Sequence, residues 1–503
     1  MSARAAYDEL IQRTRQESLL LSIHELLGWD ELTYLPPGGI THRAEQMAVL
    51  AGLVHQFGTD PRLGELLDTV QRSDLVHDPL SAEAVNVREI RRTYDRQLRL
   101  PRSLVEEIAR VTSLAQQQWE VARKQNQYRR LAPWLDRVVA LKREEAEALG
   151  YESTAYDALL QEYEPDATSA EIARLFADLR DRLIPLVNRL SGARRRADVS
   201  ILTREYPLEQ QRVLSELAAT TLGFDFQRGR LDTAAHPFCT SIGPGDCRIT
   251  TRYDSRNFCD CFFAVLHEVG HGLYEQGLDI AHYGTPLGEA VSAGVHESQS
   301  RLWENLVGRS RPFWEHFFPL ARRSFPAALG DVVLDDFYFA LNNVQKTPLR
   351  VSADEVTYNL HIIVRFNLER AMIAGDLRAD DLPAAWAEAY RDSLGVAPGN
   401  DAEGCLQDGH WASGLFGYFP TYTIGNLYAA QFFERACSDL GDLARELADG
   451  NFHSLLSWLR ERVHRHGCRY PAARLVELAT KSPPDSSFFM EVLRRKYIPL
   501  YGV

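Results

Sequence analysis

The segment NFCDCFFAVLHEVGHGLYEQG, from Asn257 to Gly277, contains the most informative pattern in the chain. Its apolar side chains recur at intervals of three and four residues, at Phe262, Phe263, Leu266, Val269 and Leu273. This spacing predicts a buried helix, because residues three and four positions apart share one helical face. The glycine at the end of the segment, Gly277, is expected to close the helix.

Two histidines of this segment, His267 and His271, are four residues apart. On a helix they lie one turn apart on one face, as two ligands of a single tetrahedral zinc ion require. Glu268 follows the first histidine, where its carboxylate can hold a water molecule and take its proton. The alternative interpretation is a pair of hydrogen-bonded histidines in the core, with no metal.

A catalytic zinc site needs a third protein ligand and an open position. A histidine six residues after the second one is excluded, because that position is Gly277. The other common solution is a glutamate from the next helix, and TPLGEAVSAGVHESQSRLWENLVG predicts such a helix with Pro286 near its start. This segment contains four possible ligands: Glu289, His296, Glu297 and Glu304. Spacing alone does not choose among them.

The sequence just before the histidine segment departs from the helical pattern. In TSIGPGDCRITTRY, from Thr240 to Tyr253, GPGD is typical of a turn, and CRITTRY alternates and is β-branched. We therefore expect a short hairpin beside the metal helix. A strand edge in that place can pair with an extended peptide.

Most of the 503 residues follow a helical period. Segments such as SLVEEIARVTSLAQQQWEVARKQ and SAEIARLFADLRDRLIPLVNRL space their apolar residues at three and four. Ser169 and Glu171, which follow PDAT, predict the start of the second of these helices. No repeat of fixed period and no Gly/Ser/Pro-rich linker divides the chain. The prediction is one large, mainly α domain over residues 1–503.

The net charge of −13 argues against nucleic acid or an anionic membrane as the main partner. The N-terminus has no signal-peptide pattern, and no apolar run approaches the roughly 20 residues that span a bilayer. The seven cysteines are an odd number and form no disulfide framework, which fits a reducing compartment. A cytoplasmic protein is therefore expected.

The two histidine motifs, HEVGHGLYEQG and HESQSRLWEN, resemble those of the carboxypeptidase Taq family of zinc metallocarboxypeptidases. The glutamate of the family's HES(Q/N) motif is its third metal ligand, so the resemblance assigns this role to Glu297. Four further segments are similar to family sequences: DCRIT (Asp246–Thr250), LRVSAD (Leu349–Asp354), GCLQDGHW (Gly404–Trp411) and GWDELTYLPPGGITHRAEQMAVL (Gly28–Leu50). These matches occur in the order of the family and extend along nearly the whole chain.

The resemblance implies a helical, saddle-like fold with a deep active-site groove and a small sheet beside the metal. The zinc-binding core would span about residues 236–310, and the substrate-binding segments about 345–425. Family members use Zn²⁺, for which Co²⁺ can substitute, and are typically cytoplasmic homodimers. They remove residues from peptide C-termini with broad specificity. A metal-dependent carboxypeptidase with Glu268 as its general base is therefore expected.

Four more residues are expected to complete the site. His410 in QDGHW and Tyr422 in FGYFPTY are the predicted donors to the oxyanion of the tetrahedral intermediate. Arg350 is the first choice for binding the terminal carboxylate, because the arginine fork matches a carboxylate, and Arg248 is the second. In the alternative interpretation, Arg350 forms a structural ion pair with Asp354, one helical turn further on.

Two other functions are compatible with the metal motif. A helical zinc oligopeptidase that cleaves internal bonds of short peptides would share the metal chemistry, but it needs no cation for a terminal carboxylate. A helical scaffold with a vestigial metal site belongs to a different class, and the intact ligand set argues against it. Peptide substrates are expected for either peptidase.

Overall fold

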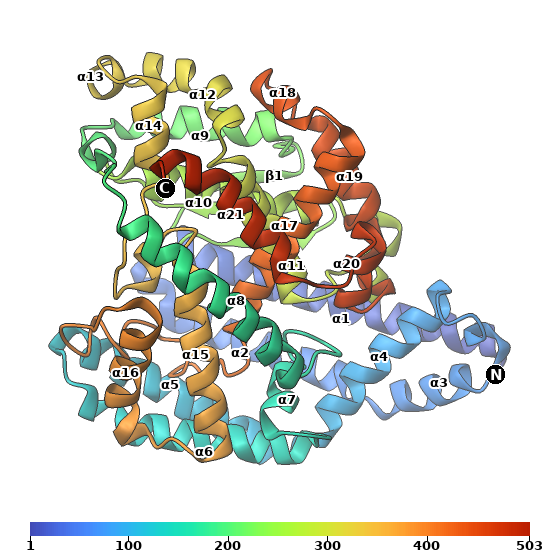
Figure 1. Cartoon of the computed structure of the whole chain (residues 1–503). Helices are drawn as coiled ribbons and strands as arrows, with labels where there is room; N and C mark the ends of the chain where they lie inside the picture. The colour runs from blue at the N-terminus through green and yellow to red at the C-terminus, as the bar shows by residue number, and fades with distance from the viewer.

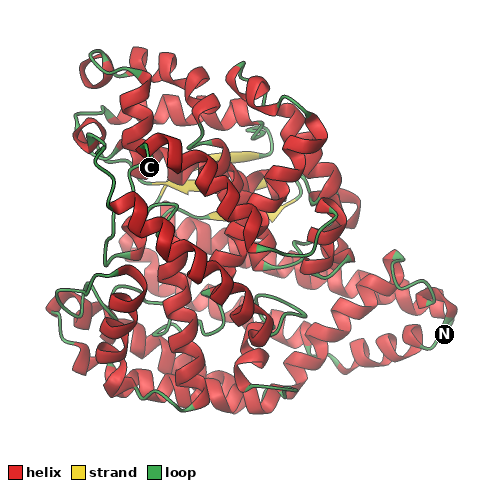
Figure 2. Ribbon diagram, in the orientation of Figure 1, coloured by secondary structure: helices red, strands yellow, loops and turns green.

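Helices dominate the computed structural model, which describes residues 1–503 (Figure 2). The helices before the sheet are α1 (Ala3–Thr33), α2 (Ile40–Gly58), α3 (Pro61–Gln71), α4 (Ala82–Arg99), α5 (Arg102–Gln125), α6 (Ala132–Leu149), α7 (Ala155–Leu160), α8 (Ser169–Ser191) and α9 (Leu208–Leu222). The helices after it are α10 (Phe258–Glu275), α11 (Ala293–Arg301), α12 (Arg311–Ser324), α13 (Pro326–Leu329), α14 (Leu334–Leu341), α15 (Tyr358–Ala374), α16 (Leu382–Leu394), α17 (Pro420–Leu440), α18 (Leu443–Ala448), α19 (His453–Arg462), α20 (Ala472–Thr480) and α21 (Ser486–Tyr501). The predicted mainly α class is confirmed.

The start of α8 follows from its local sequence. The Thr168 hydroxyl accepts a hydrogen bond from the backbone N–H of Glu171, and the Glu171 carboxylate accepts one from the backbone N–H of Thr168. This capping box satisfies N–H groups that have no partner within the first helical turn. The helix begins at Ser169, as predicted.

The sheet has three short strands, β1 (Gly229–Thr233), β2 (Cys239–Gly243) and β3 (Asp246–Thr251). β2 and β3 form the predicted antiparallel hairpin. Gly245 in its turn has a φ of +85°, a left-handed conformation that glycine adopts without steric cost. The sequence did not predict β1, which pairs parallel to β3 and makes β3 the central strand. β2 is therefore an edge strand.

α10 is the helix predicted from the histidine segment. The side chain of Asn257 caps it by accepting a hydrogen bond from the N–H of Asp260, and its apolar face is buried. The helix ends at Glu275 with Gln276 as its C-cap, so Gly277 directly follows it, where the closing glycine was predicted. Gly277 has a second reason to be glycine: a Cβ there would lie 2.2 Å from Nδ1 of His464. It therefore also permits close packing.

α11 begins later than the sequence predicts. Pro286 lies in a short 3-10 turn, and the helix itself starts at Ala293. The Ser292 hydroxyl caps the helix by accepting a hydrogen bond from the N–H of Val295. A capping hydroxyl marks the start of a helix more strongly than a nearby proline does, so α11 begins after Ser292 and not at Pro286. Glu289 therefore lies before the helix, not within it.

Two hydrophobic clusters form the interior. The larger one contains 108 buried residues between Val111 and Tyr501, so it unites the helices from α5 to α21 into one domain. The smaller one contains 10 buried residues from α1, α3 and α4, which project from the main body beside the N-terminus (Figure 1). None of the helices has the length and apolar character needed to cross a membrane.

Candidate metal centre and active site

Two glycines allow the helices of the metal motif to approach closely. At Gly270 of α10, a Cβ would lie 2.5 Å from Cα of Ser300 and 2.6 Å from the carbonyl oxygen of Gln299 on α11. At Gly425 of α17, a Cβ would lie 2.6 Å from Cγ of Glu297. A side chain at either position would push the helices apart. The glycines therefore set the distance between Glu297 and the histidines of α10.

His267, His271 and Glu297 bring three ligand atoms together. Oε2 of Glu297 lies 3.7 Å from Nε2 of His267 and 3.5 Å from Nε2 of His271. One ligand atom from each residue lies within 4.8 Å of the others. Tetrahedral coordination with bonds of about 2.0–2.2 Å separates neighbouring ligand atoms by about 3.3–3.6 Å. The three side chains therefore fit a divalent metal ion.

The second ring nitrogen of each histidine contacts another side chain. Nδ1 of His267 lies 2.9 Å from Oε2 of Glu304. Nδ1 of His271 lies 2.6 Å from Nδ1 of His296, whose Nε2 lies 2.8 Å from Oε1 of Glu275. These contacts fix the ring orientations and leave both Nε2 atoms for a metal. His296 and Glu304, two of the possible ligands in the sequence, are thus arranged to orient the histidines.

Arg301 balances part of the negative charge around the histidines. Its Nε lies 2.7 Å from Oε1 of Glu297, and its Nη1 lies 3.3 Å from Oε2 of Glu304. Burial raises the pKa of both carboxyl groups, but Arg301 and His267 outweigh it. The pKa of Glu297 is therefore well below its usual range, and the pKa of Glu304 is about 2. Burial lowers the pKa of His271 to about 3, which keeps its imidazole neutral, as metal binding requires.

Glu268 differs from these carboxylates because it has no hydrogen-bond partner in the protein. The residue is only 6 % exposed and lines the same cleft as His267 and His271. Burial raises the pKa of its carboxyl group to about 7. The free oxygens of Glu268 are therefore available to a group in the cleft.

A cleft of about 900 Å³ lies over the three ligand atoms. Phe238, just before the edge strand β2, and Cys239, its first residue, line it from one side, and residues of α4 and of the start of α17 line it elsewhere. This cleft is the groove expected of the fold. Glu289, the remaining possible ligand in the sequence, borders the cleft but does not belong to the group of ligand atoms.

The two predicted oxyanion donors lie at different depths. Tyr422 lines the cleft, whereas His410 lies behind it, with its Nε2 3.4 Å from the Tyr422 hydroxyl. Burial lowers the pKa of His410 to about 4, so its ring is neutral at pH 7. Tyr418 also lines the cleft and packs edge-on against Tyr422, with ring centroids 5.3 Å apart. Sequence reasoning missed Tyr418, although it lies in the same FGYFPTY segment.

Arg350 pairs with Asp408 and not with Asp354, so the alternative interpretation of its ion pair was wrong. Its Nε and Nη2 donate to Oδ1 of Asp408 at 2.9 and 2.7 Å, and its Nη1 donates to the Tyr358 hydroxyl at 3.1 Å. Asp408 also accepts a hydrogen bond from Nε of Arg365 at 2.7 Å. Asp354 accepts hydrogen bonds from backbone N–H groups of the residues that follow it, which occupies its carboxylate locally.

The pairing leaves a positive charge near the cleft. Burial raises the pKa of Asp408, but Arg350 and Arg365 outweigh burial and hold it well below its usual range. Two arginines therefore share one ionised carboxylate. The Arg350 guanidinium carbon lies 5.4 Å from the ring centroid of Tyr422, which lines the cleft, and the Arg350 side chain is 11 % exposed. Arg350 itself is not among the residues that line the cleft.

Arg248, the second choice for the terminal carboxylate, has a balanced charge. Its Nε and Nη2 donate to the two carboxylate oxygens of Asp246 at 2.8 and 2.7 Å. Its guanidinium carbon lies 4.1 Å from the ring centroid of Trp29, which occupies one face of the group. Arg248 does not line the cleft either.

Comparisons with known proteins agree with this geometry. The sequence matches the family described as carboxypeptidase Taq (M32) metallopeptidase over residues 9–497. It is 52 % identical to thermostable carboxypeptidase 1 of Thermus thermophilus, a match that covers 100 % of both chains, and 37 % identical to carboxypeptidase 1 of Bacillus subtilis over 95 % of each. The crystal structure of the M32 carboxypeptidase from Deinococcus radiodurans R1 is similar with a TM-score of 0.95 at 40 % identity, covering 99 % of this chain and 100 % of that one. The chain therefore belongs to the carboxypeptidase Taq (M32) family of metallopeptidases and is a metallocarboxypeptidase.

Proposed function

We propose that this metallocarboxypeptidase removes C-terminal residues from peptides with broad specificity, using Zn²⁺ held by His267, His271 and Glu297. Co²⁺ is expected to substitute. The observation that carries the proposal is the convergence of three ligand atoms beside the unpaired carboxylate of Glu268 in one cleft. Two imidazoles and one carboxylate are a ligand set typical of catalytic zinc. When bound, the metal polarises the scissile carbonyl and makes a water molecule more acidic.

Glu268 is the general base of the proposed reaction. Its carboxylate takes the proton of the attacking water and then delivers it to the leaving amine. Glu297 and Glu304 are less suited to this role, because two arginines, Arg301 and Arg309, and the histidines pair with their oxygens. The absence of a protein partner for Glu268 supports this division of roles.

Tyr422 donates a hydrogen bond to the oxyanion that develops on the scissile carbonyl. Its position in the lining of the cleft supports this role. His410 contacts the Tyr422 hydroxyl from behind, so it orients that hydroxyl rather than reaching the substrate. Because the His410 ring is neutral at pH 7, it adds no positive charge beside the Tyr422 hydroxyl.

Arg350 binds the terminal carboxylate of the substrate. Asp408 and Tyr358 use three of its five N–H groups, so one N–H on Nη1 and one on Nη2 are left for a ligand. The unbalanced charge of the two arginines around Asp408 favours an anion. Arg248 is the weaker choice, because one carboxylate already balances its charge.

The substrate backbone pairs with the outer edge of β2. This strand is hydrogen-bonded only to β3, and its first residue, Cys239, borders the cleft. An extended peptide can add to such an edge through its main chain, so affinity need not depend on side-chain identity. This mode of binding supports broad specificity.

A matched pair of peptides tests the proposed function. A peptide with a free C-terminal carboxylate should lose single residues in succession, and its C-terminally amidated twin should react far more slowly; mass spectrometry of the products distinguishes them. A chelator should stop hydrolysis. Internal fragments, or equal rates for the two peptides, would instead identify a helical zinc oligopeptidase.

We also infer that the chain forms a homodimer through the exposed side of α1 and α2. α2 buries only Arg43 and Gly58, although its sequence is largely apolar. Val49 on α2 is 64 % exposed and Leu32 on α1 is 62 % exposed. Contiguous exposed apolar surface is typical of interaction sites. The Val49→Glu variant should sediment as a monomer, whereas a monomeric wild type would contradict the inference.

A further inference from the structure

Cys239 and Cys247 form a pair of free thiols beside the active-site cleft. Their Sγ atoms lie 3.7 Å apart on the adjacent strands β2 and β3. Cys239 is paired in register with Ile249, and Cys247 with Ser241, so the two cysteines are diagonal neighbours on one face of the sheet. This face packs against α10, since a Cβ at Gly272 would lie 3.5 Å from Sγ of Cys247.

The distance suits a shared metal ion better than a disulfide. Diagonal residues of an antiparallel pair have Cα atoms about 7–8 Å apart, whereas a disulfide usually joins Cα atoms about 4.4–6.8 Å apart. Two sulfurs bound to one tetrahedral zinc at about 2.3 Å are separated by about 3.8 Å. Cys239 and Cys247 therefore match the second geometry without movement of the backbone.

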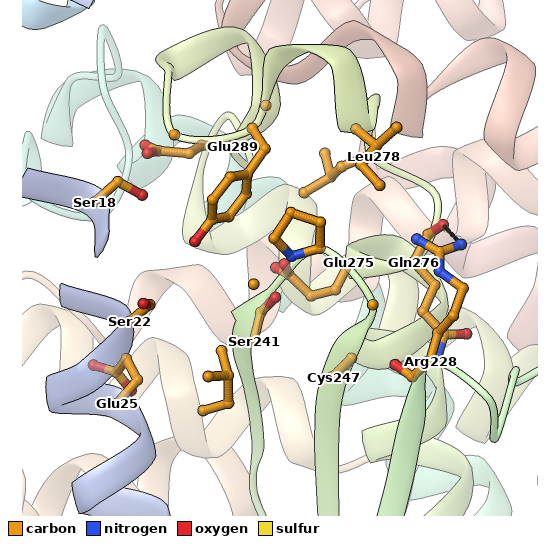
Figure 3. Close-up of a pocket in the computed structure, with 18 of the residues that line it drawn as sticks. Ser18, Ser22, Glu25, Arg228, Ser241, Cys247, Glu275, Gln276, Leu278 and Glu289 are labelled. Atoms are coloured by element: carbon orange, nitrogen blue, oxygen red, sulfur yellow. Dashed lines mark hydrogen bonds between the residues drawn. The ribbon is translucent and has the colours of Figure 1, made fainter. Parts of the chain in front are cut away.

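Each cysteine lines a cavity, although Cys247 is only 3 % exposed. Cys239 borders the active-site cleft. Cys247 borders a second cavity of about 250 Å³, in which Ser241 of β2, Cys247 of β3 and Glu275 at the end of α10 lie near one another (Figure 3). The pair therefore lies between two cavities, and the one at Cys239 is the active-site cleft.

The surrounding charge favours a cation. Glu268, Gly272 and Glu275 follow one another at helical spacing along α10, so they share the face that packs on the sheet. The hydrogen bond with Cys247, burial, and the charges of Glu268 and Glu275 together raise the pKa of the Cys239 thiol. The two carboxylates that disfavour a free thiolate attract a divalent cation.

We propose that Cys239 and Cys247 form a second, inhibitory site for a thiophilic divalent ion such as Zn²⁺ or Cd²⁺. Binding replaces the two S–H bonds by two metal–sulfur bonds and releases two protons, and water completes the coordination. The inhibition rests on the proposed function, because the bound ion occupies the end of β2 along which the peptide is proposed to lie.

Cadmium titration of the metal-loaded enzyme tests the site without turnover. One Cd²⁺ per chain should produce a thiolate-to-cadmium charge-transfer absorption, which the nitrogen and oxygen ligands of the catalytic centre cannot give. Cys239→Ser and Cys247→Ala should each abolish it, and Cys437→Ser on α17 should retain it. The site is refuted if both variants keep the absorption or if the wild type shows none. It is refuted also if peroxide readily forms a Cys239–Cys247 disulfide while cadmium gives no absorption.

Zinc inhibition tests the functional consequence. Excess Zn²⁺ should inhibit the wild type and Cys437→Ser equally, and the concentration for half-inhibition should rise at least about tenfold in Cys239→Ser, since one ligand is lost. Equal inhibition of all three proteins would overturn the inhibitory role. Glu268→Gln should keep the cadmium absorption, so a failure of the proposed mechanism would appear separately, as an undiminished kcat in that variant.

Discussion

Two buried clusters of charged side chains near the cleft have opposite charge imbalances. The metal-binding cluster contains Glu268, Glu297, Glu304, Arg301, Arg309, His267 and His271. The arginine cluster contains Arg350, Arg365 and Asp408. Three carboxyl groups face two arginines in the first, and two arginines face one carboxylate in the second. Buried charge is costly unless an opposite charge accompanies it, so each imbalance indicates the missing partner: a metal cation in the first cluster and a substrate anion in the second.

Removing a metal ligand should have the largest effect. Glu297→Ala leaves two histidines, which hold a divalent ion weakly, so bound metal and activity should both be lost. Metal content per chain after dialysis, measured by atomic emission, checks this. Glu289→Ala is the matched control and should keep its metal, because Glu289 lies outside the group of ligand atoms. Full occupancy in Glu297→Ala would show that the third ligand is another residue.

Removing the base should separate chemistry from metal binding within the same cluster. Glu268→Gln preserves the shape of the side chain and the three ligands. Its kcat should fall by about 10²–10⁴, the usual scale for a lost general base, with metal content unchanged. Turnover close to that of the wild type in the metal-loaded variant would exclude Glu268 from proton transfer.

Removing the shared carboxylate should make the arginine cluster unstable. Asp408→Asn leaves two buried arginines without a counter-ion, which should lower the free energy of unfolding by about 3–5 kcal/mol in urea titrations. Because folding lowers the pKa of Asp408, its stabilisation is present at neutral pH and is lost as the pH falls below about 4. The difference between wild type and variant should therefore shrink in acid. Equal stability at pH 7 would mean that the arginines tolerate the imbalance unaided.

Removing the proposed anchor should affect substrates according to their charge. Arg350→Ala should cost about 2–5 kcal/mol of transition-state binding, or roughly 30- to several-thousand-fold in kcat/KM, for free-acid peptides. Amidated peptides should be cleaved as slowly as by the wild type. The fold should survive, because Asp408 keeps its bond with Arg365. Arg248→Ala serves as the comparison, and a larger loss in that variant would transfer the role to Arg248.

The smallest effect is expected where a residue only orients a ligand. Glu304→Gln keeps a hydrogen-bond acceptor for His267 but removes one negative charge, so metal affinity should fall by about 10–100-fold. Competition with a chromophoric chelator measures this affinity. Unchanged affinity would mean that the charge balance of the metal-binding cluster does not depend on Glu304.

The sequence predicted the features that depend on short spacing. His267 and His271 share a helical face because they are four residues apart, and the apolar period of α10 identifies the face that is buried. The caps of α8 and the β2–β3 turn are likewise local, since the interacting groups lie within a few residues. The family resemblance named Glu297 among four possible ligands, a choice that spacing left open.

Tertiary structure decided the features that join distant segments. Ser292 starts α11 beyond Glu289, and a π-helical turn from Leu302 to Val307 changes the helical phase at Glu304, so no simple period relates these carboxylates to the histidines. Asp408 pairs with Arg350 across 58 positions, and β1 exists only because β3 offers it a parallel partner. A repeat of 3.6 or 2 residues determines which face a side chain occupies, whereas the packing of the whole chain determines what that face meets. The sequence therefore determined that His267 and His271 share one face of α10, and the folded chain decided which charged side chains surround them.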